Sequence, residues 1–227
     1  MAASLDSAPP RAEAAARVRL TEIFLSIQGE ADSVGWPTVF VRLTGCPLRC
    51  QYCDTQYAFH GGEWFDIGQV LARVASFETQ RVCVTGGEPL AQKHCLTLLR
   101  SLCDAGCKVS LETSGAIDLT GVDPRVTRVV DVKTPASGES ERNRLQDLKV
   151  LRTDEQIKFV ICDRTDFEWS RDLVRAHRLY EICTVLFSPS YTQLPARTLA
   201  EWILEERLPV RLQVQLHKYL WGDVPGR

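Results

Sequence analysis

Three cysteines lie within eight residues of one another, at Cys46, Cys50 and Cys53, in the spacing C-x3-C-x2-C. Thiolates at this spacing can ligate three irons of a [4Fe-4S] cluster, and no fourth cysteine follows at ligand spacing. Clusters that serve only in electron transfer are usually held by four cysteines. The fourth iron is therefore expected to stay open to a small molecule, which indicates a reactive cluster.

A structural zinc site is the alternative interpretation of the same loop. Such a site usually has four ligands, often in two separated pairs. Here His60, in a loop bordered by glycines, would have to supply the fourth ligand. The chain would then be a zinc-stabilised binding module and not an enzyme, and an iron and zinc analysis separates the two interpretations.

A second motif, Thr85-Gly86-Gly87-Glu88-Pro89, directly follows a predicted strand. Paired glycines let backbone groups approach a ligand closely, and a carboxylate at such a turn can bind an ammonium group. Without the cysteine loop upstream, the motif would be interpreted as an ordinary turn between a strand and a helix.

Together, the cysteine loop with an aromatic residue before its last cysteine and the Gly-Gly-Glu-Pro segment resemble the radical S-adenosylmethionine (SAM) superfamily. The resemblance implies that SAM binds the open iron through its amino and carboxylate groups. It further implies that reductive cleavage gives a 5′-deoxyadenosyl radical, which abstracts hydrogen from a substrate. The SAM contacts that it implies are Tyr52, Cys53, Asp54, Gly87, Glu88, Ser114, Asp131, Val132, Lys133, Ser188, Pro189 and Ser190.

Two of these SAM segments depart from the pattern of the superfamily's members. Asp131-Val132-Lys133 stands where other members carry Ser-Pro-Lys, so only the lysine matches. Ser188-Pro189-Ser190 stands where some relatives carry Gln-Pro, so only the proline matches.

Four further segments resemble the 7-carboxy-7-deazaguanine synthase family, and the likeness runs from about residue 18 to residue 221. The segments are Ile27-Gln28-Gly29-Glu30, Phe40-Val41-Arg42, Cys53-Asp54-Thr55 and His217-Lys218-Tyr219. The resemblance implies a carbon–nitrogen lyase that contracts the ring of 6-carboxy-5,6,7,8-tetrahydropterin to 7-carboxy-7-deazaguanine, with loss of ammonia. This is a step toward queuosine, a deazapurine of modified tRNA.

The residue chemistry suits a carboxylated pterin. Arg42 can hold the carboxylate with a forked, charge-assisted pair, and Gln28 and Glu30 can bind the hydrogen-bonding edge of the ring. The resemblance adds a Mg2+ ion at the hydroxyl of Thr55, and Mg2+ commonly needs few protein ligands. The full set of implied substrate contacts is Ile27, Gln28, Gly29, Glu30, Arg42, Thr85 and His217.

The elements that must position these residues alternate between strand and helix. Strands are predicted at residues 38–43, 81–85, 108–113, 128–133, 156–161, 183–187 and 211–216, and helices at 66–74, 90–105, 166–180 and 198–207. Repeated βα units imply a mainly parallel sheet. Since a complete eight-stranded barrel takes about 250 residues, the expected fold is an α/β incomplete (β/α) barrel of the radical SAM type with about six core parallel strands.

Composition limits the setting in which the protein works. The chain has 227 residues with a net charge of −2, so it lacks the cationic field expected of a nucleic-acid binder. No apolar run is long enough to cross a membrane, and nine cysteines is an odd number for complete disulfide pairing. We expect a cytoplasmic protein with a disordered extension over residues 1–17 and one domain over residues 18–227.

Partners are implied by the resemblance and not by the residues. A flavodoxin or ferredoxin is the expected electron donor, and the chain is expected to form a homodimer. A second enzyme class stays open, namely a radical SAM activase that installs a glycyl radical on a partner protein. Such an activase would need neither Arg42 nor Thr55.

Overall fold

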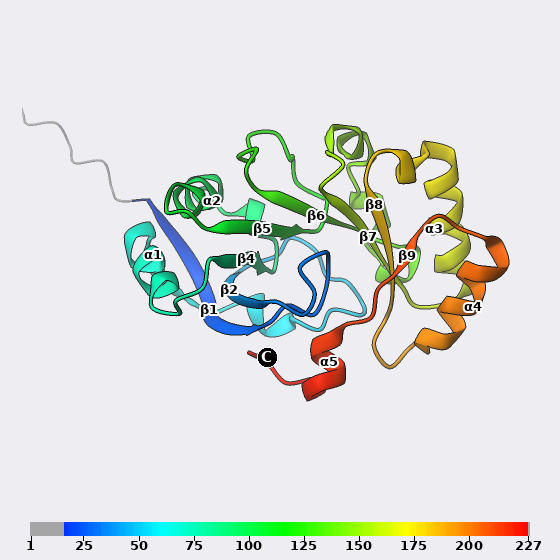
Figure 1. The fold of residues 1–227 in the computed structure, drawn as a ribbon, viewed down its shortest axis with the longest axis horizontal. Helices are drawn as coiled ribbons and strands as arrows, with labels where there is room; N and C mark the ends of the chain where they lie inside the picture. Colours follow the sequence, from blue (N-terminus) through cyan, green and yellow to red (C-terminus); the bar gives the residue numbers. More distant parts are fainter. Residues whose placement is uncertain (1–15, 227) are drawn as a thin grey trace, which may run out of the picture.

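The structure is a computed structural model that describes residues 16–226, and its frame is a single mixed β-sheet (Figure 1). The strand order across the sheet is β3-β1-β2-β4-β5-β6-β7-β8-β9. The strands are β1 (Arg17–Ile27), β2 (Pro37–Leu43), β3 (Glu63–Asp66), β4 (Arg81–Gly86), β5 (Lys108–Thr113), β6 (Thr127–Val132), β7 (Gln156–Ile161), β8 (Thr184–Pro189) and β9 (Arg211–Leu212). The α-helices are α1 (Ile67–Ala75), α2 (Cys95–Asp104), α3 (Arg164–His177), α4 (Ala196–Glu206) and α5 (Leu216–Trp221).

The sheet is mostly parallel and does not close on itself. Strand β2 and strands β4 to β9 run parallel, whereas β1 pairs antiparallel with β2 and with β3. Six of the parallel strands have six or seven residues, and the seventh, β9, has two. The predicted incomplete barrel with about six core parallel strands is therefore confirmed. The antiparallel strands β1 and β3 were not predicted.

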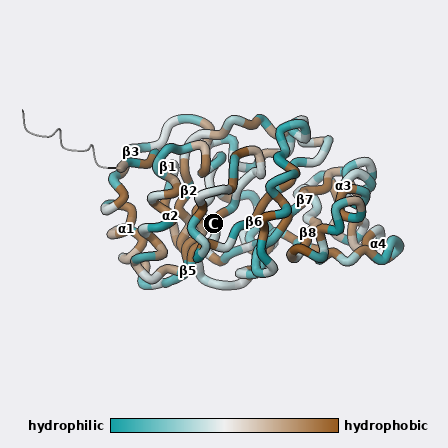
Figure 2. Tube along the Cα trace, turned by 90° about the horizontal axis from the view of Figure 1, so that it is seen from above, coloured by the Kyte–Doolittle hydropathy of each residue, from teal (hydrophilic) through white to brown (hydrophobic). Residues whose placement is uncertain are grey.

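Side chains alternate between the two faces of this sheet, as they must in extended strands. On β2, Val39, Val41 and Leu43 pack into a core with α1 and α2, while Phe40 and Arg42 point to the opposite face and line a cavity. The same alternation of side chains continues along the sheet. A second core forms there between strands β6–β8 and helices α3 and α4. Figure 2 shows hydrophobic segments along the central strands and alternating hydropathy along the helices. Helices α1 to α4 thus cover one face of the sheet and leave the other for a site.

Helix α2 begins later than the predicted helix at residues 90–105. Residues Pro89–Ala91 form a short 3-10 turn, and the α-helix starts at Cys95. The turn forms because the Glu88 carboxylate accepts a hydrogen bond from Leu90 N at 3.0 Å. The predicted end is confirmed, since the chain leaves the helix at Gly106 with a φ of +83°.

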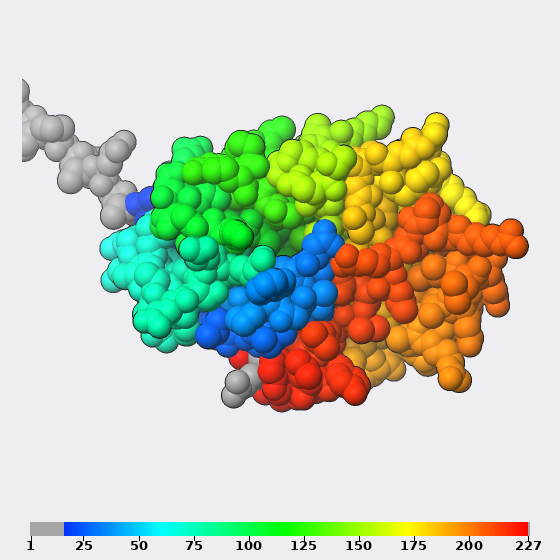
Figure 3. Space-filling model, viewed as in Figure 1, coloured from blue at the N-terminus to red at the C-terminus, as the bar shows by residue number. Residues whose placement is uncertain are grey.

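The last predicted strand, at residues 211–216, is wrong beyond its first two residues. After Leu212 the chain leaves the sheet, and Leu216 N donates a hydrogen bond to Gly29 O at 3.0 Å. This bond ties the segment to the loop after β1, and helix α5 starts there. His217, which directly follows the predicted strand, therefore lies on α5. In Figure 3 the C-terminal segment meets the loop after β1 on the surface of the molecule.

The boundary of the predicted N-terminal extension also shifts. Residues 1–15 of that extension lie outside the described residues. Ala16 O accepts a hydrogen bond from Ile67 N at 3.1 Å, and Arg17 is the first residue of β1. The folded part therefore begins before residue 18. In residues 16–226, none of the helices combines the length and the apolar character that a membrane crossing needs.

Candidate active site

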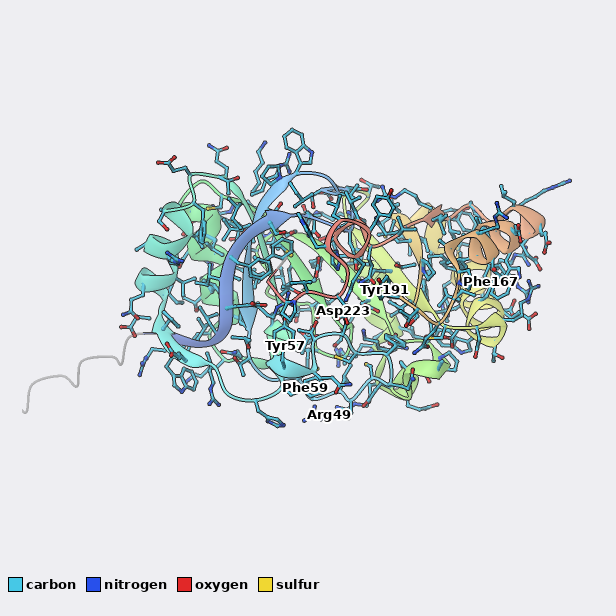
Figure 4. All side chains as sticks on the ribbon, turned by 90° about the horizontal axis from the view of Figure 1, so that it is seen from below. Arg49, Tyr57, Phe59, Phe167, Tyr191 and Asp223 are labelled. Atoms are coloured by element: carbon cyan, nitrogen blue, oxygen red, sulfur yellow. The ribbon has the colours of Figure 1, made fainter. Side chains whose placement is uncertain are left out.

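A cavity of about 570 Å³ occupies the inner face of the sheet. Strands β2 and β4 to β8 form its wall, and its rim includes the loops after β1, β2 and β8 and the segment around α5. In Figure 4, Asp223 and Tyr191, which both line this cavity, lie near one another at the centre of the molecule. The loop after β1 is expected to lie far from the C-terminal ends of the parallel strands, because β1 is antiparallel. Curvature of the sheet brings it into the same cavity.

The cysteine loop forms one side of this cavity. Cys46, Cys50 and Cys53 line the cavity as half-buried free thiols, whereas the other six cysteines, all within the described residues, do not line it. Burial raises the pKa of Cys50 to about 11, and burial also raises the pKa of Cys46 and of Cys53. Three soft sulfur donors on one wall fit an iron–sulfur cluster.

The zinc alternative gains no support from the geometry. Among residues 16–226 no three His, Cys, Asp or Glu side chains are arranged to hold a single metal ion. The cysteine loop is held in place by hydrogen bonds to the loop after β6: Glu139 Oε1 accepts from Arg49 N at 2.6 Å, and Ser137 O accepts from Gln51 N at 3.0 Å.

The paired glycines Gly86 and Gly87 allow the end of β4 to pack closely against the cysteine loop. A Cβ on Gly87 would lie 2.2 Å from Gly45 O and 2.8 Å from the Cβ of Cys46. Gly86 has a φ of +150°, and a Cβ there would lie 2.2 Å from Leu43 O. Only glycine lets the end of β4 approach the cysteine loop this closely. Both glycines also line the cavity.

Glu88 lies behind the cavity wall and not in it. Its carboxylate is fully buried and accepts hydrogen bonds from Thr113 Oγ1 at 2.9 Å, Ser114 N at 2.7 Å and Ser114 Oγ at 2.5 Å. With the bond from Leu90 N, both oxygens are engaged by the protein itself. The carboxylate is therefore not free for the predicted contact with the SAM ammonium group. Its hydrogen bonds instead join the end of β4 to the end of β5.

Five neighbouring strands each place one polar side chain on the cavity wall. In strand order they are Arg42 on β2, Thr85 on β4, Glu112 on β5, Asp131 on β6 and Lys158 on β7. Arg42 is paired in register with Thr85, and Asp131 with Lys158, so each of these pairs stands side by side. The parity of the strands thus gathers groups that are far apart in sequence.

Arg42 is held by its Nε atom. That nitrogen donates to Glu22 Oε1 at 2.7 Å, and the same oxygen accepts from Tyr57 Oη at 2.9 Å. The guanidinium carbon lies 5.8 Å from the ring centres of Phe24 and Tyr57. The two terminal nitrogens make no hydrogen bond to the part of the chain that the structure describes, so they form a fork available to a carboxylate.

Glu112 joins two of the predicted substrate contacts. Its Oε1 accepts from Gln28 Nε2 at 3.2 Å, and its Oε2 accepts from Thr85 Oγ1 at 3.0 Å. The side-chain oxygen Oε1 of Gln28 in turn accepts from Glu30 N at 3.1 Å. Gln28 and Thr85 are thereby brought together from the loop after β1 and from β4.

A chain of buried charges runs along the wall from the loop after β1 to the cysteine loop. Lys158 Nζ lies 2.6 Å from Glu30 Oε2 and 3.4 Å from Asp131 Oδ2, and Asp131 Oδ1 lies 3.1 Å from Lys133 Nζ. Gln215 Nε2 donates to the other oxygen of Glu30 at 2.7 Å. Burial is the largest single effect and would raise the pKa of Glu30, but the charge and hydrogen bond of Lys158 act together with the hydrogen bond from Gln215 to lower that pKa. Glu30 is therefore an ionised acceptor at neutral pH.

The loop after β1 and α5 meet at Gly29. His217 lines the cavity, while Gly29 is pressed against its ring, and burial lowers the pKa of His217. The imidazole is thus neutral at neutral pH. One residue further on, Lys218 Nζ lies 3.3 Å from Asp54 Oδ2 and also contacts Asp223, so α5 is tied to the residue that follows the last cysteine.

Most of the predicted SAM contacts lie together near the cysteine loop. Tyr52, Lys133 and Ser114 line the cavity, as do residues 188–190 at the end of β8. Lys133 Nζ lies 5.8 Å from the ring centre of Tyr52. Val132 differs from this prediction, because its side chain points to the opposite face of the sheet and packs in the core against β7 and α3.

Thr55 lines the cavity at the same rim. Its Oγ1 donates to Asp54 Oδ1 at 2.8 Å. Ile27 lines the cavity from the end of β1.

Sequence reasoning gave no role to Glu22 or Lys158, and it named Lys218 only as part of a family segment. For Lys158 a signal existed, because a single lysine interrupts the otherwise apolar end of the strand, Ile157-Lys158-Phe159-Val160-Ile161. A charge inside a buried parallel strand is costly unless it is paired, so it marks the functional face of the sheet. Glu22 carried no such signal, because β1 itself was not predicted.

Comparisons with known proteins agree with this site. Residues 40–129 match the Radical SAM superfamily. The fold resembles the crystal structure of QueE from Escherichia coli, with a TM-score of 0.73 over 88% of this chain and 95% of that chain, at 24% sequence identity. The incomplete barrel and the cavity with three cysteines define a radical SAM enzyme. The superfamily implies a [4Fe-4S] cluster and SAM as cofactors.

Sequence relatives narrow the class. The 7-carboxy-7-deazaguanine synthase of Chlorobaculum tepidum is 43% identical, over 91% of this chain and 96% of its own length. That of Koribacter versatilis is 40% identical, over 90% of this chain and 97% of its own length. The chain belongs to the 7-carboxy-7-deazaguanine synthase family. The resemblance identified in the sequence is confirmed, and the glycyl-radical activase gains no support.

Proposed function

We propose that this protein converts 6-carboxy-5,6,7,8-tetrahydropterin to 7-carboxy-7-deazaguanine and releases ammonia. The observation that carries the proposal is the pairing of two chemistries in one cavity. The fork of Arg42 and the ionised acceptor Glu30 face the same space as Cys46, Cys50 and Cys53. A cationic fork and a carboxylate acceptor on one wall match a bicyclic ligand with a carboxylate and a row of N–H donors.

The chain's own residues bind and orient the substrate. The terminal nitrogens of Arg42 receive the carboxylate, since Nε is already committed to Glu22. Glu30 and Gln28 accept and donate along the pyrimidine edge, supported by Glu112 and Lys158 behind them. When bound, the cluster and SAM supply the carbon radical that removes a hydrogen atom from the substrate.

Contacts to the cofactors follow from the lining of the cavity. Cys46, Cys50 and Cys53 would hold the cluster. The backbone of Gly86 and Gly87 beside the cysteine loop, together with Ser114 and Lys133, would hold SAM. The end of β8, with Ser188, Pro189 and Ser190, would complete that site.

The proposal extends to a Mg2+ ion at Thr55. The hydroxyl and the neighbouring Asp54 carboxylate are oxygen donors at the cavity rim, 2.8 Å apart, and Mg2+ takes few protein ligands besides waters and substrate. Activity should fall when a chelator removes Mg2+ and return when it is added back.

We propose a cytoplasmic enzyme that forms a homodimer, takes electrons from a flavodoxin or ferredoxin and acts in the queuosine pathway of tRNA modification. All nine cysteines are free thiols, in keeping with a reducing compartment.

Anaerobic turnover tests the function. Protein reconstituted with iron and sulfide is incubated with SAM, Mg2+, dithionite and the carboxylated tetrahydropterin, and the deazaguanine is detected by its absorbance and mass. The expected result is product in excess of the SAM consumed, together with released ammonia. Cleavage of SAM without any deazaguanine, by protein with an intact cluster, would contradict the proposal.

A further inference from the structure

The geometry points to Lys158 as a positioning residue that keeps Glu30 ionised and oriented for the N–H edge of the substrate. This inference rests on the proposed function and goes beyond it, because Lys158 acts through Glu30 and was not among the predicted contacts.

The first observation is the geometry of the pair. Lys158 lies on the inner face of β7, and its Nζ is 2.6 Å from Glu30 Oε2 in the loop after β1. Both side chains are buried, at 10% exposure for Lys158 and 9% for Glu30. If the lysine were removed, water would therefore be a poor substitute for it beside Glu30. A buried carboxylate without a cation favours its protonated form.

The second observation is the use of the lone pairs of Glu30. A carboxylate has about four acceptor positions. One at each oxygen is taken, by Lys158 at 2.6 Å and by Gln215 at 2.7 Å. Since Glu30 also lines the cavity, its other positions can face a ligand. Two neighbours thus fix the plane of the carboxylate while its ionised form keeps acceptor capacity for N–H donors.

The third observation is that Lys158 is itself held in place. Asp131 on β6 is paired in register with Lys158, and Asp131 Oδ2 lies 3.4 Å from Lys158 Nζ. The ammonium group therefore has partners on two sides and cannot swing away from Glu30 without leaving a buried carboxylate unpaired. The charged and titratable groups that face Glu30 from other elements are Lys158 on β7, Glu112 on β5 and His217 on α5, with Asp131 on β6 behind Lys158.

Two consequences for substrate binding follow. In the wild-type protein Glu30 is an ionised acceptor throughout the neutral range, so affinity for a pterin should change little with pH. Without the lysine charge, burial raises the fraction of protonated Glu30, and a protonated carboxyl loses acceptor capacity toward N–H donors. Affinity should then fall as the pH is lowered and recover as the pH is raised.

The test uses reconstituted holoenzyme with SAM and the unreactive probe 6-carboxypterin, whose binding is followed by fluorescence between about pH 5.5 and about pH 8.5. Lys158→Met removes the charge, Lys158→Gln keeps a hydrogen-bond donor without charge, and Lys158→Arg restores a cation. Each variant is compared with the wild type at the same pH, which cancels any shared titration of His217. Iron content and thermal unfolding confirm that each variant is folded.

The expected result is that Lys158→Met and Lys158→Gln bind the probe about tenfold to a hundredfold more weakly at the acid end and approach the wild type at the alkaline end. Lys158→Arg should stay close to the wild type, and the double variant Glu30→Gln with Lys158→Met should lose the pH dependence. In turnover, KM should rise in the uncharged variants with a much smaller change in kcat.

The inference would be overturned if folded Lys158→Met or Lys158→Gln bound the probe as the wild type does at every pH. It would also be overturned if affinity fell by the same factor at every pH. Failure of the proposed function looks different, because then the wild-type protein itself would neither bind 6-carboxypterin nor form the deazaguanine. If Lys158→Met does not fold, Lys158→Gln carries the same test.

Discussion

The ring of His217 lies directly against Gly29, so that a Cβ on the glycine would lie 2.0 Å from Nδ1 and 2.9 Å from the backbone nitrogen of the histidine. The two residues come from the loop after β1 and from α5, almost at opposite ends of the described chain. Leu216 N, next to the histidine, also donates to Gly29 O at 3.0 Å. This contact joins the two sides of the incomplete barrel at the cavity rim.

Gly29→Ala should therefore displace α5 and weaken substrate binding. The added methyl meets backbone as well as a side chain, so we expect a loss of about 1–3 kcal/mol in the free energy of unfolding and a raised KM. Gly68→Ala is the matched control, because nothing lies within 4 Å of its added Cβ in helix α1, and it should gain about 0.5–1 kcal/mol. Equal effects in the two variants would contradict the contact.

Arg42→Ala should separate substrate binding from cofactor chemistry. Loss of the fork removes a charge-assisted pair, so KM for the carboxylated pterin should rise about tenfold to a hundredfold. Slow cleavage of SAM in the absence of substrate should persist, since Arg42 lies on β2 and not in the cysteine loop. Arg73→Ala, on helix α1, is the control and should behave as the wild type. An unchanged KM in Arg42→Ala would remove the basis for the carboxylate site.

Substitution of a cluster cysteine should abolish iron loading. Cys50→Ala leaves two thiolates, so anaerobic reconstitution should give far less than the roughly four irons per chain that a [4Fe-4S] cluster contains. Cys107→Ser is the matched control, because that thiol packs against the core and not in the cavity. Full iron content and an unchanged spectrum in Cys50→Ala would show that another residue holds the cluster.

Glu88→Gln should destabilise the fold even though Glu88 has been predicted as a cofactor contact. A glutamine amide has one acceptor oxygen and would turn an NH2 group toward the donors of Thr113 and Ser114. We expect a loss of about 2 kcal/mol in the free energy of unfolding of the protein without cofactors. Glu141→Gln, at an exposed position, should cost nothing measurable. Unchanged stability with weaker SAM binding would restore the predicted direct contact.

The stability of the folded chain should fall in acid partly through Glu30. Its pKa is lowered in the folded state below the ordinary value of 4.5, because the charge and hydrogen bond of Lys158 and the hydrogen bond from Gln215 together exceed the large opposing effect of burial. The contribution is therefore complete above about pH 4.5 and is lost as the pH falls through the folded pKa. Glu30→Gln should be less stable than the wild type at pH 7 and should show a shallower loss in acid, measured by denaturant unfolding. Parallel curves for the two proteins would rule out this contribution.

The sequence by itself determined the class of enzyme and most of the frame. The spacing of Cys46, Cys50 and Cys53 is a local property, because three ligands within one loop need no distant partner. The parallel strands were predictable for the same reason, since each shows an apolar run over a few consecutive residues. The arginine before the loop was identified through its family motif.

Only the tertiary structure decided which charges meet in the cavity. Lys158 and Glu30 are 128 positions apart. They are in contact because alternate side chains of β7, including Lys158, point into the cavity, and the loop after β1 lies against the same cavity. Glu88 appeared in the sequence to be free for a ligand, but its carboxylate accepts hydrogen bonds from residues at the end of β5. His217 directly follows the predicted strand at residues 211–216 but lies on α5, because the contact with Gly29 holds that segment away from the sheet edge. Contacts between elements that are distant in the chain depend on how the sheet curves, and no local pattern of residue types encodes that curvature.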